Sequence, residues 1–241
     1  MAKRITVLFV LIAGAMLLSG CSPDFSNVKP IDPNNSFWDR YFVFPLSWIL
    51  DQMALWLWGS YGLSILVVTL VIRLLLFPLM HRQMRSSKQM QAIQPELIKL
   101  QKKYKGNQEK LQQEMLKLFQ KNNVNPFMGC LPILIQMPIL FAFYNAIVRN
   151  SEIREHSFLW MDLGQPDPFL LLPILASLST FVQLRVTRRM MPTPAELTPQ
   201  AEQQQQMLRM MQVVFPAMIF FIGITLPSAL SLYWVYSNLF S

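Results

Sequence analysis

Long uncharged runs alternate with charged segments along this 241-residue chain, and they give the first guide to its fold. Asp, Glu, Lys and Arg are absent from residues 52–72, 122–148, 168–184 and 210–241. A helix that crosses the apolar core of a bilayer, roughly 30 Å thick, needs about 20 mostly apolar residues. The pattern therefore predicts membrane-spanning helices and argues against a water-borne domain.

The last of these runs is too long for one span, because a single helix over residues 210–241 would extend about 48 Å. Gly223 and Pro227 mark a break inside it. We therefore predict an all-α integral membrane protein with five transmembrane helices. Their predicted bounds are 58–80, 127–148, 167–187, 208–224 and 227–241.

Residues 37–57, ahead of the first span, combine aromatic residues with the charged residues Asp39, Arg40 and Asp51. The aromatic residues include Trp38, Phe42, Phe44, Trp48 and Trp56. Aromatic rings combined with charges are typical of helices that lie in the membrane interface. We predict an interfacial amphipathic helix here. The alternative is an N-terminal extension of the first span.

The N-terminus has the pattern of a secretory signal peptide over residues 1–20, with Lys3 and Arg4 ahead of an apolar stretch too short to span a bilayer comfortably. The stretch ends in Leu18-Ser19-Gly20-Cys21, which resembles a bacterial lipobox. We expect the thiol of Cys21 to carry a diacylglyceryl group and residues 21–36 to form an extracytoplasmic tether. The alternative is a short transmembrane helix with an incidental cysteine.

The composition supports a membrane protein, with 53% hydrophobic and 14% charged residues and a mean hydropathy of +0.32. Two cysteines give no disulfide framework. The two histidines, His81 and His156, have no Cys or second His at ligand spacing. We therefore expect no metal site, no cofactor and no enzymatic activity.

Loop charges predict the orientation, because Lys and Arg accumulate in cytoplasmic loops. Residues 81–122 carry ten Lys and Arg against three Glu, and loop 185–209 adds Arg185, Arg188, Arg189 and Arg209. The loop 149–166 instead mixes both signs. These loops place the N-terminus outside and the C-terminus in the cytoplasm, in agreement with the lipobox.

The basic segment 81–122 has apolar residues at spacings of three and four on both sides of Gly106. This predicts a helical hairpin in which Asn107 caps the second arm and Pro95 bends or restarts the first. Its basic residues either form a solvent-exposed face without a partner or provide a docking surface for the ribosome, a targeting factor or anionic lipid. No platform of aromatic side chains interleaves the lysines, so sequence-specific nucleic-acid binding is not supported.

Arg73 is the most informative residue, because it lies about 21 Å into the first span at 1.5 Å per residue. The four long apolar runs contain no Asp or Glu that would neutralise its charge. A charged side chain at this depth is costly unless it is hydrated or paired. We therefore predict a hydrated environment around Arg73; the alternative is that its side chain reaches the cytoplasmic head groups.

Polar residues at helical spacing in the other spans predict a wet cavity around this charge, open toward the cytoplasm. Alone, each set would be ordinary interhelical packing. The sets are Gly62, Thr69 and Arg73; Thr180, Gln183 and Thr187; Pro227, Ser231, Trp234 and Asn238; and the single residue Gln136.

These features together resemble a known family, the YidC/Oxa/Alb membrane-protein insertases, in the five-span lipoprotein form of Gram-positive bacteria. The resemblance rests on Val71-Ile72-Arg73-Leu74, on the basic hairpin, on the stretch 125–138, which reads NPFMGCLPILIQMP, and on Leu232-Tyr233-Trp234. It covers the chain from about Phe37 onward.

The resemblance implies a hydrophilic groove that is open to the cytoplasm and to lipid, with Arg73 as its central charge. By the same resemblance Gln183, Trp234 and Gln136 are further groove residues, and nascent membrane proteins and the Sec translocase are the implied partners. An alternative function is a small-anion transporter or channel that uses the intramembrane arginine, although we find no internal repeat. An intramembrane protease is not supported, since neither GxSxG nor HExxH occurs.

Overall fold

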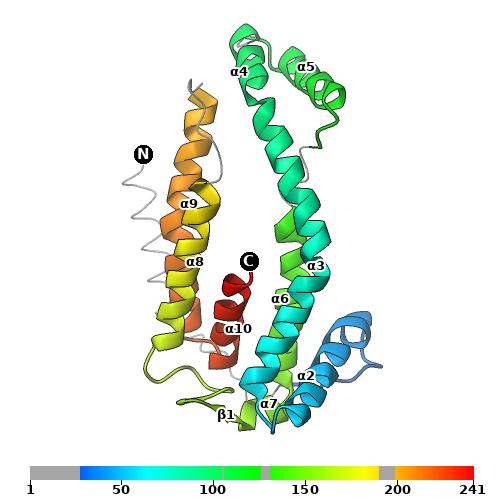
Figure 1. The fold of residues 1–241 in the computed structure, drawn as a ribbon, viewed down its shortest axis with the longest axis vertical. Helices are drawn as coiled ribbons and strands as arrows, with labels where there is room; N and C mark the ends of the chain where they lie inside the picture. Colours follow the sequence, from blue (N-terminus) through cyan, green and yellow to red (C-terminus); the bar gives the residue numbers. More distant parts are fainter. Residues whose placement is uncertain (1–27, 105, 126–130, 190–198) are drawn as a thin grey trace.

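A computed structural model describes residues 28–104, 106–125, 131–189 and 199–241, and these residues are mostly helical (Figure 1). The predicted signal peptide, Cys21 and most of the tether lie outside the described residues.

The first helices follow the predicted interfacial segment. A π-helical turn, η1 (Asp39–Val43), leads into α2 (Phe44–Trp56), whose first turn contains a proline. The chain then leaves the helix at Trp58 and Gly59, which have φ of 55° and 79°. Aromatic side chains of this segment are widely exposed, Trp56 at 79%. Such exposed rings suit a membrane interface, and the position of α2 in a bilayer stays a prediction.

Helix α3 runs from Tyr61 to Ala92 and is longer than the predicted span 58–80. Residues 81–92 contain Gln, Met, Arg, Ser and Lys but no helix breaker, so the helix continues beyond its apolar part. Within the described chain, its segment Tyr61–Met90 is the one helix that is long and apolar enough to cross a membrane. Leu134–Arg149 and Arg209–Gly223 are shorter apolar helices.

The predicted hairpin is present as α4 (Gln94–Lys103) and α5 (Gln108–Lys121), which pack against each other. Pro95 lies in the first turn of α4, directly after α3 ends, so the predicted restart at this proline is confirmed. The side chain of Asn107 accepts the N–H of Lys110 at 3.0 Å, which confirms the predicted cap.

The remaining helices are α6 (Leu131–Arg149), the short α7 (Ser151–Glu155), α8 (Leu171–Arg189), α9 (Pro199–Gly223) and α10 (Ser228–Leu239). The break between α9 and α10 lies where Gly223 and Pro227 predict it. A small hairpin was not predicted: β1 (Ser157–Phe158) pairs antiparallel with β2 (Met161–Asp162), Phe158 opposite Met161.

The helices form two arms joined by α10 (Figure 1). Helix α3 packs with α2 and α10, whereas α9 packs along α8, and α8 packs on the other side of α10. We call the end with α4 and α5 the hairpin end and the end with α7, β1 and β2 the loop end. The C-terminus lies between the arms, well below the hairpin end in Figure 1.

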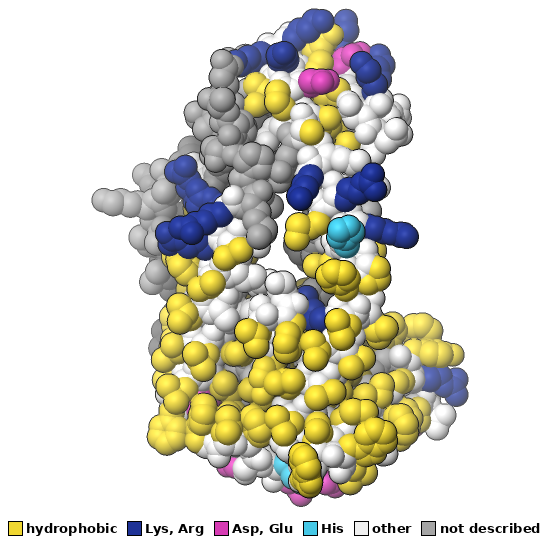
Figure 2. Space-filling model, viewed as in Figure 1, with side chains coloured by type: hydrophobic (Ala, Val, Ile, Leu, Met, Phe, Trp, Pro, Cys, Tyr) yellow, Lys and Arg dark blue, Asp and Glu magenta, His cyan; other side chains and the backbone are white. Residues whose placement is uncertain are grey.

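Buried side chains concentrate at the loop end. On α3 the last buried residue before the hairpin is Thr69, and on α8 it is Thr180. Phe143, Ile147 and Ile65 are fully buried in the same core. Figure 2 shows hydrophobic side chains gathered over the lower part of the molecule and Lys and Arg on the upper parts of both arms. The buried core therefore fills the loop end and does not extend along the full length of the helices.

Hydrogen bonds between segments tie the loop end together. The first N–H groups of α10, at Ser228 and Ala229, donate to the carbonyl oxygens of Gln165 and Leu163. Asp167 accepts the N–H of Leu172 at 2.7 Å and so satisfies the start of α8. Because orphan N–H groups at helix starts are costly when buried, these contacts fix both helices to the loop.

Candidate functional site

Arg73 projects from α3 toward the last turn of α10. Its Nη2 atom donates to the backbone carbonyl of Ser237 at 3.0 Å and also to the Ser237 hydroxyl. Arg73 lies one turn beyond Thr69, at the point where the core ends. The charge is therefore held at the edge of the buried core, where α3 contacts the last turn of α10.

Thr69 lies beside this arginine with only 2% of its surface exposed. Its Oγ1 atom is the one buried side-chain oxygen or nitrogen, within the described chain, that has no hydrogen-bond partner. Helical threonines commonly bond a carbonyl of the preceding turn, which makes an unpaired hydroxyl here a costly feature.

The third member of this group comes from α6. Gln136 donates its Nε2 hydrogen to the hydroxyl of Tyr233 at 2.9 Å. The Tyr233 ring in turn stacks on Phe143, with ring centroids 4.2 Å apart. Tyr233 is 2% exposed, so this bond links α6 to α10 inside the core.

These side chains enclose a cavity of about 10 Å³, close to the volume that holds one water molecule. The lining residues come from α3, α6 and α10: Thr69, Ile72, Arg73, Leu76, Gln136, Ile139, Phe143, Tyr233 and Ser237. The predicted association of Thr69, Arg73 and Gln136 is therefore seen in the structure, in a cavity far smaller than a substrate helix. We call this group the arginine cavity.

Trp234, by contrast, faces α8. Its indole Nε1 donates to Thr180 Oγ1 at 3.1 Å, and its ring lies 6.4 Å from that of Phe215 on α9. Asn238 donates to the same Thr180 oxygen at 2.7 Å. Gln183 donates to the hydroxyl of Ser241. These residues form a second polar cluster on the opposite side of α10 from Arg73.

Ser231 belongs to neither cluster, since it packs against α9. A Cβ atom built on Gly223 would lie 3.1 Å from Ser231 Oγ, and Ser231 is 5% exposed. The single cavity expected from the sequence thus takes the form of two polar clusters separated by α10. Helical spacing shows which face of a helix is polar, but it does not show which neighbouring helix that face contacts. The sequence therefore could not show that the polar residues divide into two clusters.

Two residues of the arginine cavity were missed from the sequence, Tyr233 and Ser237. Tyr233 lies inside the Leu232-Tyr233-Trp234 motif, and Ser237 follows it by one helical turn. That spacing was a usable signal. The more obvious polar set starting at Pro227 marks a different face of the same helix, about a quarter turn or more away.

The helices around Arg73 carry basic residues and no acidic ones. Helices α3, α6, α8 and α10 contain no Asp or Glu. Two ion pairs in the described part of the chain, Arg149 with Asp39 and Lys117 with Glu114, both lie away from Arg73. The oxygen atoms that accept its hydrogen bonds are neutral, so its positive charge is uncompensated locally.

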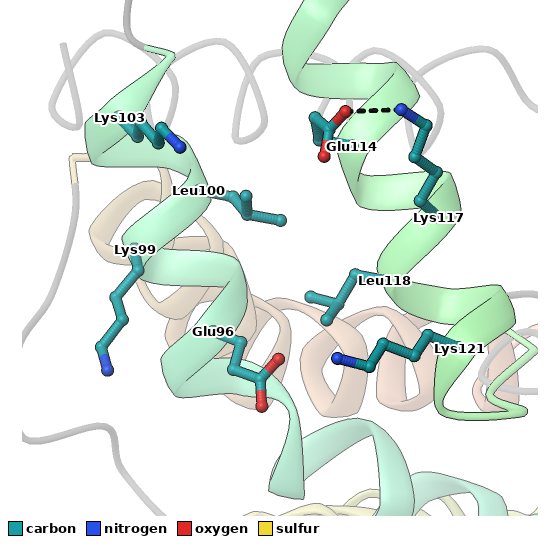
Figure 3. Close-up of a pocket in the computed structure, with 8 residues that line it drawn as sticks. All are labelled: Glu96, Lys99, Leu100, Lys103, Glu114, Lys117, Leu118 and Lys121. Atoms are coloured by element: carbon teal, nitrogen blue, oxygen red, sulfur yellow. Dashed lines mark hydrogen bonds and ion pairs between the residues drawn. The ribbon is translucent and has the colours of Figure 1, made fainter.

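The hairpin holds a larger cleft, of about 340 Å³, between α4 and α5 (Figure 3). Leu100 and Leu118 point into it from the two helices, and Lys117 pairs with Glu114 at 2.7 Å. Its rim carries four lysines: Lys99, Lys103, Lys117 and Lys121. Glu96 and Glu114 also line the cleft, so its rim carries both signs with lysines in excess. Apolar surface inside a charged rim is suited to contact with protein segments.

Comparison with known proteins gives consistent matches. The family model described as 60Kd inner membrane protein matches residues 53–241. The chain is 49% identical to membrane protein insertase MisCA of Bacillus subtilis (strain 168), over 99% of this chain and 88% of that protein. It is 46% identical to membrane protein insertase YidC 2 of Bacillus anthracis, over 100% of this chain and 91% of the relative. It is 47% identical to membrane protein insertase YidC of Oceanobacillus iheyensis, over 100% of this chain and 94% of that protein.

Proposed function

The chain belongs to the 60Kd inner membrane protein family, the YidC/Oxa/Alb insertases, and on this premise we propose that it moves hydrophobic segments of newly made proteins into the bilayer along the face that carries Arg73. The family predicted from the sequence is thereby confirmed. The protein is a bacterial membrane protein and an insertase, not an enzyme.

The observation that carries the proposed mechanism is the uncompensated charge of Arg73 at the edge of the core. An arginine within an apolar helix is expensive, and its neutral partners at Ser237 do not cancel its charge. A carboxylate on an incoming segment would form charge-assisted hydrogen bonds with the same guanidinium. Arg73 therefore supplies an attraction for acidic tails at a depth where such tails would otherwise face apolar surroundings.

Five spans and a lipid anchor complete the proposed topology. Helices α3, α6, α8, α9 and α10 are the proposed spans, with the loop end outside the cell and the hairpin end in the cytoplasm. The basic rim of the hairpin and the Lys and Arg on the upper arms in Figure 2 support this orientation. Cys21 is the proposed site of lipidation.

In the proposed mechanism a segment with a short acidic end enters between the arms from the hairpin end. Its carboxylate reaches Arg73, while its apolar residues contact exposed apolar side chains on the same face of α3, such as Phe77, which is 66% exposed. Burial of about 20 apolar residues in lipid then drives release sideways. The membrane potential pulls the acidic end outward, at about 2.3 kcal/mol per charge per 100 mV. The cluster around Gln183 and Trp234 lines the other side of this path.

The proposed partners beyond substrates and lipid are the Sec translocase and, through the hairpin, the ribosome or a targeting factor. The cleft between α4 and α5 supports a protein contact, because Leu100 and Leu118 offer apolar surface inside the lysine rim.

The test uses the purified chain in proteoliposomes that lack Sec translocase, with two single-span substrates that differ only in Asp or Asn in a short tail. Insertion of the acidic-tail substrate is expected to fall about tenfold or more in Arg73→Ala. This factor corresponds to the free energy of one lost charge-assisted hydrogen bond. Arg73→Lys should retain much of it.

Arg82→Ala is the matched control, since Arg82 is exposed on the same helix away from the cavity. Equal losses for both tails, together with a lowered melting temperature, would make Arg73 a scaffold residue instead. A labelled small anion entering the same vesicles without any insertion would favour the transporter alternative.

A further inference from the structure

Three connections at the loop end contain a large apolar residue in the left-handed backbone region. Trp58, Leu159 and Leu170 have φ of 55°, 57° and 57°. Side chains of this size rarely adopt such a backbone, because the Cβ atom comes too close to the neighbouring carbonyl oxygen. The other described residues with positive φ are Gly59 and Asn123, whose residue types tolerate it. The three apolar residues therefore carry backbone strain that Gly or Asn would avoid.

Contacts place the three connections at the same end of the molecule (Figure 1). Trp58 lies between α2 and α3, and α3 contacts β1. Leu159 lies in the turn between β1 and β2. Leu170 directly precedes α8, where Asp167 accepts the indole N–H of the turn residue Trp160 at 3.1 Å. The three strained residues thus belong to one end of the fold.

Their side chains gain little from the protein core. Trp58 is 92% exposed, Leu159 71% and Leu170 41%. Packing within the chain therefore does not offset the strain, least of all for Trp58 and Leu159. Residues held in sparsely populated backbone regions cluster at functional sites. Their exposure points to a partner outside the chain.

The neighbouring apolar surface favours lipid as that partner. Leu171, Ile174 and Leu178 follow Leu170 along one face of α8 and are 45%, 49% and 55% exposed. Because α8 is a proposed span, this face contacts the acyl chains. Phe169 is 65% exposed as well, so the lipid-facing surface of α8 continues into the connection before it.

Polar groups at the same end indicate how deep the turns lie. Glu155 and Asp162 are exposed, so part of the loop end faces water. Trp160 is 40% exposed, and its indole N–H is bound by the buried carboxylate of Asp167. A partly exposed indole with a polar partner is typical of the boundary between head groups and acyl chains.

We propose that Trp58, Leu159 and Leu170 form an outer-leaflet anchor, in which three tight turns insert apolar side chains at this boundary and fix the depth of the loop end in the bilayer. The tight turns leave the side chains little conformational freedom to lose on insertion, which favours binding. The inference rests on the proposed function, since the proposed topology places the loop end outside the cell.

Asparagine substitution tests the anchor through the sign of its effect. Leu159→Asn relieves the backbone strain and removes the apolar side chain. In the full chain in lipid nanodiscs, it should lower the melting temperature by about 2–4 °C, because the lost lipid contact outweighs the relieved strain. Leu170→Asn should act in the same direction. A raised or unchanged melting temperature in both variants refutes the anchor.

Asn123→Leu is the matched control, because Asn123 has φ of 53° and is exposed after α5, at the hairpin end. It imposes the same strain where the proposed topology provides water, and it should therefore lower the melting temperature. Opposite shifts of equal size in Leu159→Asn and Asn123→Leu would show that Leu159 also faces water.

Photocrosslinking in cell membranes identifies the partner. Benzoyl-phenylalanine placed at Leu159 or Leu170 should give phospholipid adducts in mass spectrometry, whereas the same group at Glu155, an exposed residue of α7, should not. Absence of lipid adducts at both positions overturns the proposal. A protein adduct of defined mass in their place overturns it as well and assigns the surface to a protein partner.

A thiol at Glu155 separates the anchor from the proposed topology. An impermeant maleimide should label Glu155→Cys on protoplasts above the background of the wild type. Labelling without lipid adducts at Leu159 and Leu170 refutes the anchor alone. Absence of labelling refutes the proposed orientation and with it the outer-leaflet position. Failure of the wild type to insert substrates refutes the proposed insertion mechanism and leaves these readouts unchanged.

Discussion

Replacing Asp39 by Ala tests how the loop end is held together. The carboxylate of Asp39 accepts two hydrogen bonds from Arg149, each 2.7 Å long. Arg149 also donates to the carbonyl oxygens of Lys29 and Pro30 at 2.9 Å. The side chains of Arg149 and Asp39 are only 11% and 3% exposed. This one ion pair therefore joins the tether, η1 and the end of α6.

The expected cost follows from what the substitution leaves behind. Removing one partner of a buried pair costs about 3–5 kcal/mol, mostly because the other charge stays buried and unpaired. Arg149 keeps its two carbonyl acceptors, so we expect the lower end, about 3 kcal/mol of unfolding free energy. The exposed pair Lys117–Glu114 is the matched control, and Glu114→Ala should cost far less unfolding free energy than Asp39→Ala because water screens this pair.

The assay is denaturant unfolding in detergent, followed by tryptophan fluorescence, with Asp39→Ala, Arg149→Met and the double variant. The double variant should lose less unfolding free energy than the two single variants lose together, because it leaves no buried charge without a partner. A loss below that of Glu114→Ala would refute the argument and show that the pair is solvated in solution.

The same pair sets a pH dependence with a definite sign. The hydrogen bonds from Arg149 hold the pKa of Asp39 below its ordinary value of 3.8. A carboxyl whose folded pKa is lowered stabilises the protein above the ordinary pKa and loses that contribution as the pH falls through the folded pKa. The stability difference between wild type and Asp39→Ala should therefore shrink only under strongly acidic conditions, and a difference that vanishes near neutral pH would contradict this assignment.

Three further substitutions test the remaining contacts. Tyr233→Phe should cost about 1 kcal/mol of unfolding free energy because it leaves the half-buried Gln136 amide without its partner. Adding Gln136→Leu should recover much of this loss, and additive losses in the same assay would contradict the bond. Asn107→Ala should lower the stability of α5 by about 1 kcal/mol, seen as faster amide exchange at Lys110, and unchanged exchange there would refute the cap. Gly164→Ala should destabilise the loop end by about 1–3 kcal/mol, because its Cβ would lie 2.5 Å from the Arg154 carbonyl, whereas Gly106→Ala, with nothing within 4 Å, should be tolerated.

Elements with local signals were predictable from the sequence. Pro95 lacks the N–H that a continuous helix needs, which suits it to the first turn of α4. Asn107 caps α5 through its own side chain, and Pro227 stands directly before α10. Each of these features depends on residues within one helical turn, so the sequence pattern alone contains the information.

Features that depend on distant residues were not predictable. The turn that includes β1 and β2 fits Gly62 so closely that a Cβ there would lie 2.2 Å from the Phe158 ring, a contact between segments far apart in sequence. The assignment of Ser237 rather than Gln183 to Arg73 likewise depends on how α10 is rotated between α3 and α8. Periodicity defines which face of a helix is polar, but rotation against neighbours is decided by packing of the whole core.

Buried contacts are distributed unevenly between the two ends of the molecule. At the loop end, helix starts, the tether and the ion pair of Asp39 are bonded to one another, and the core fills the space between them. Beyond Thr69 on α3 and Thr180 on α8, no described residue of these two helices is buried, so the arms there are held mainly by the last turn of α10. Local opening costs least where few buried contacts must be broken. Any movement that admits a substrate segment should therefore begin between the arms at the hairpin end and stop at the level of Arg73, where the core starts.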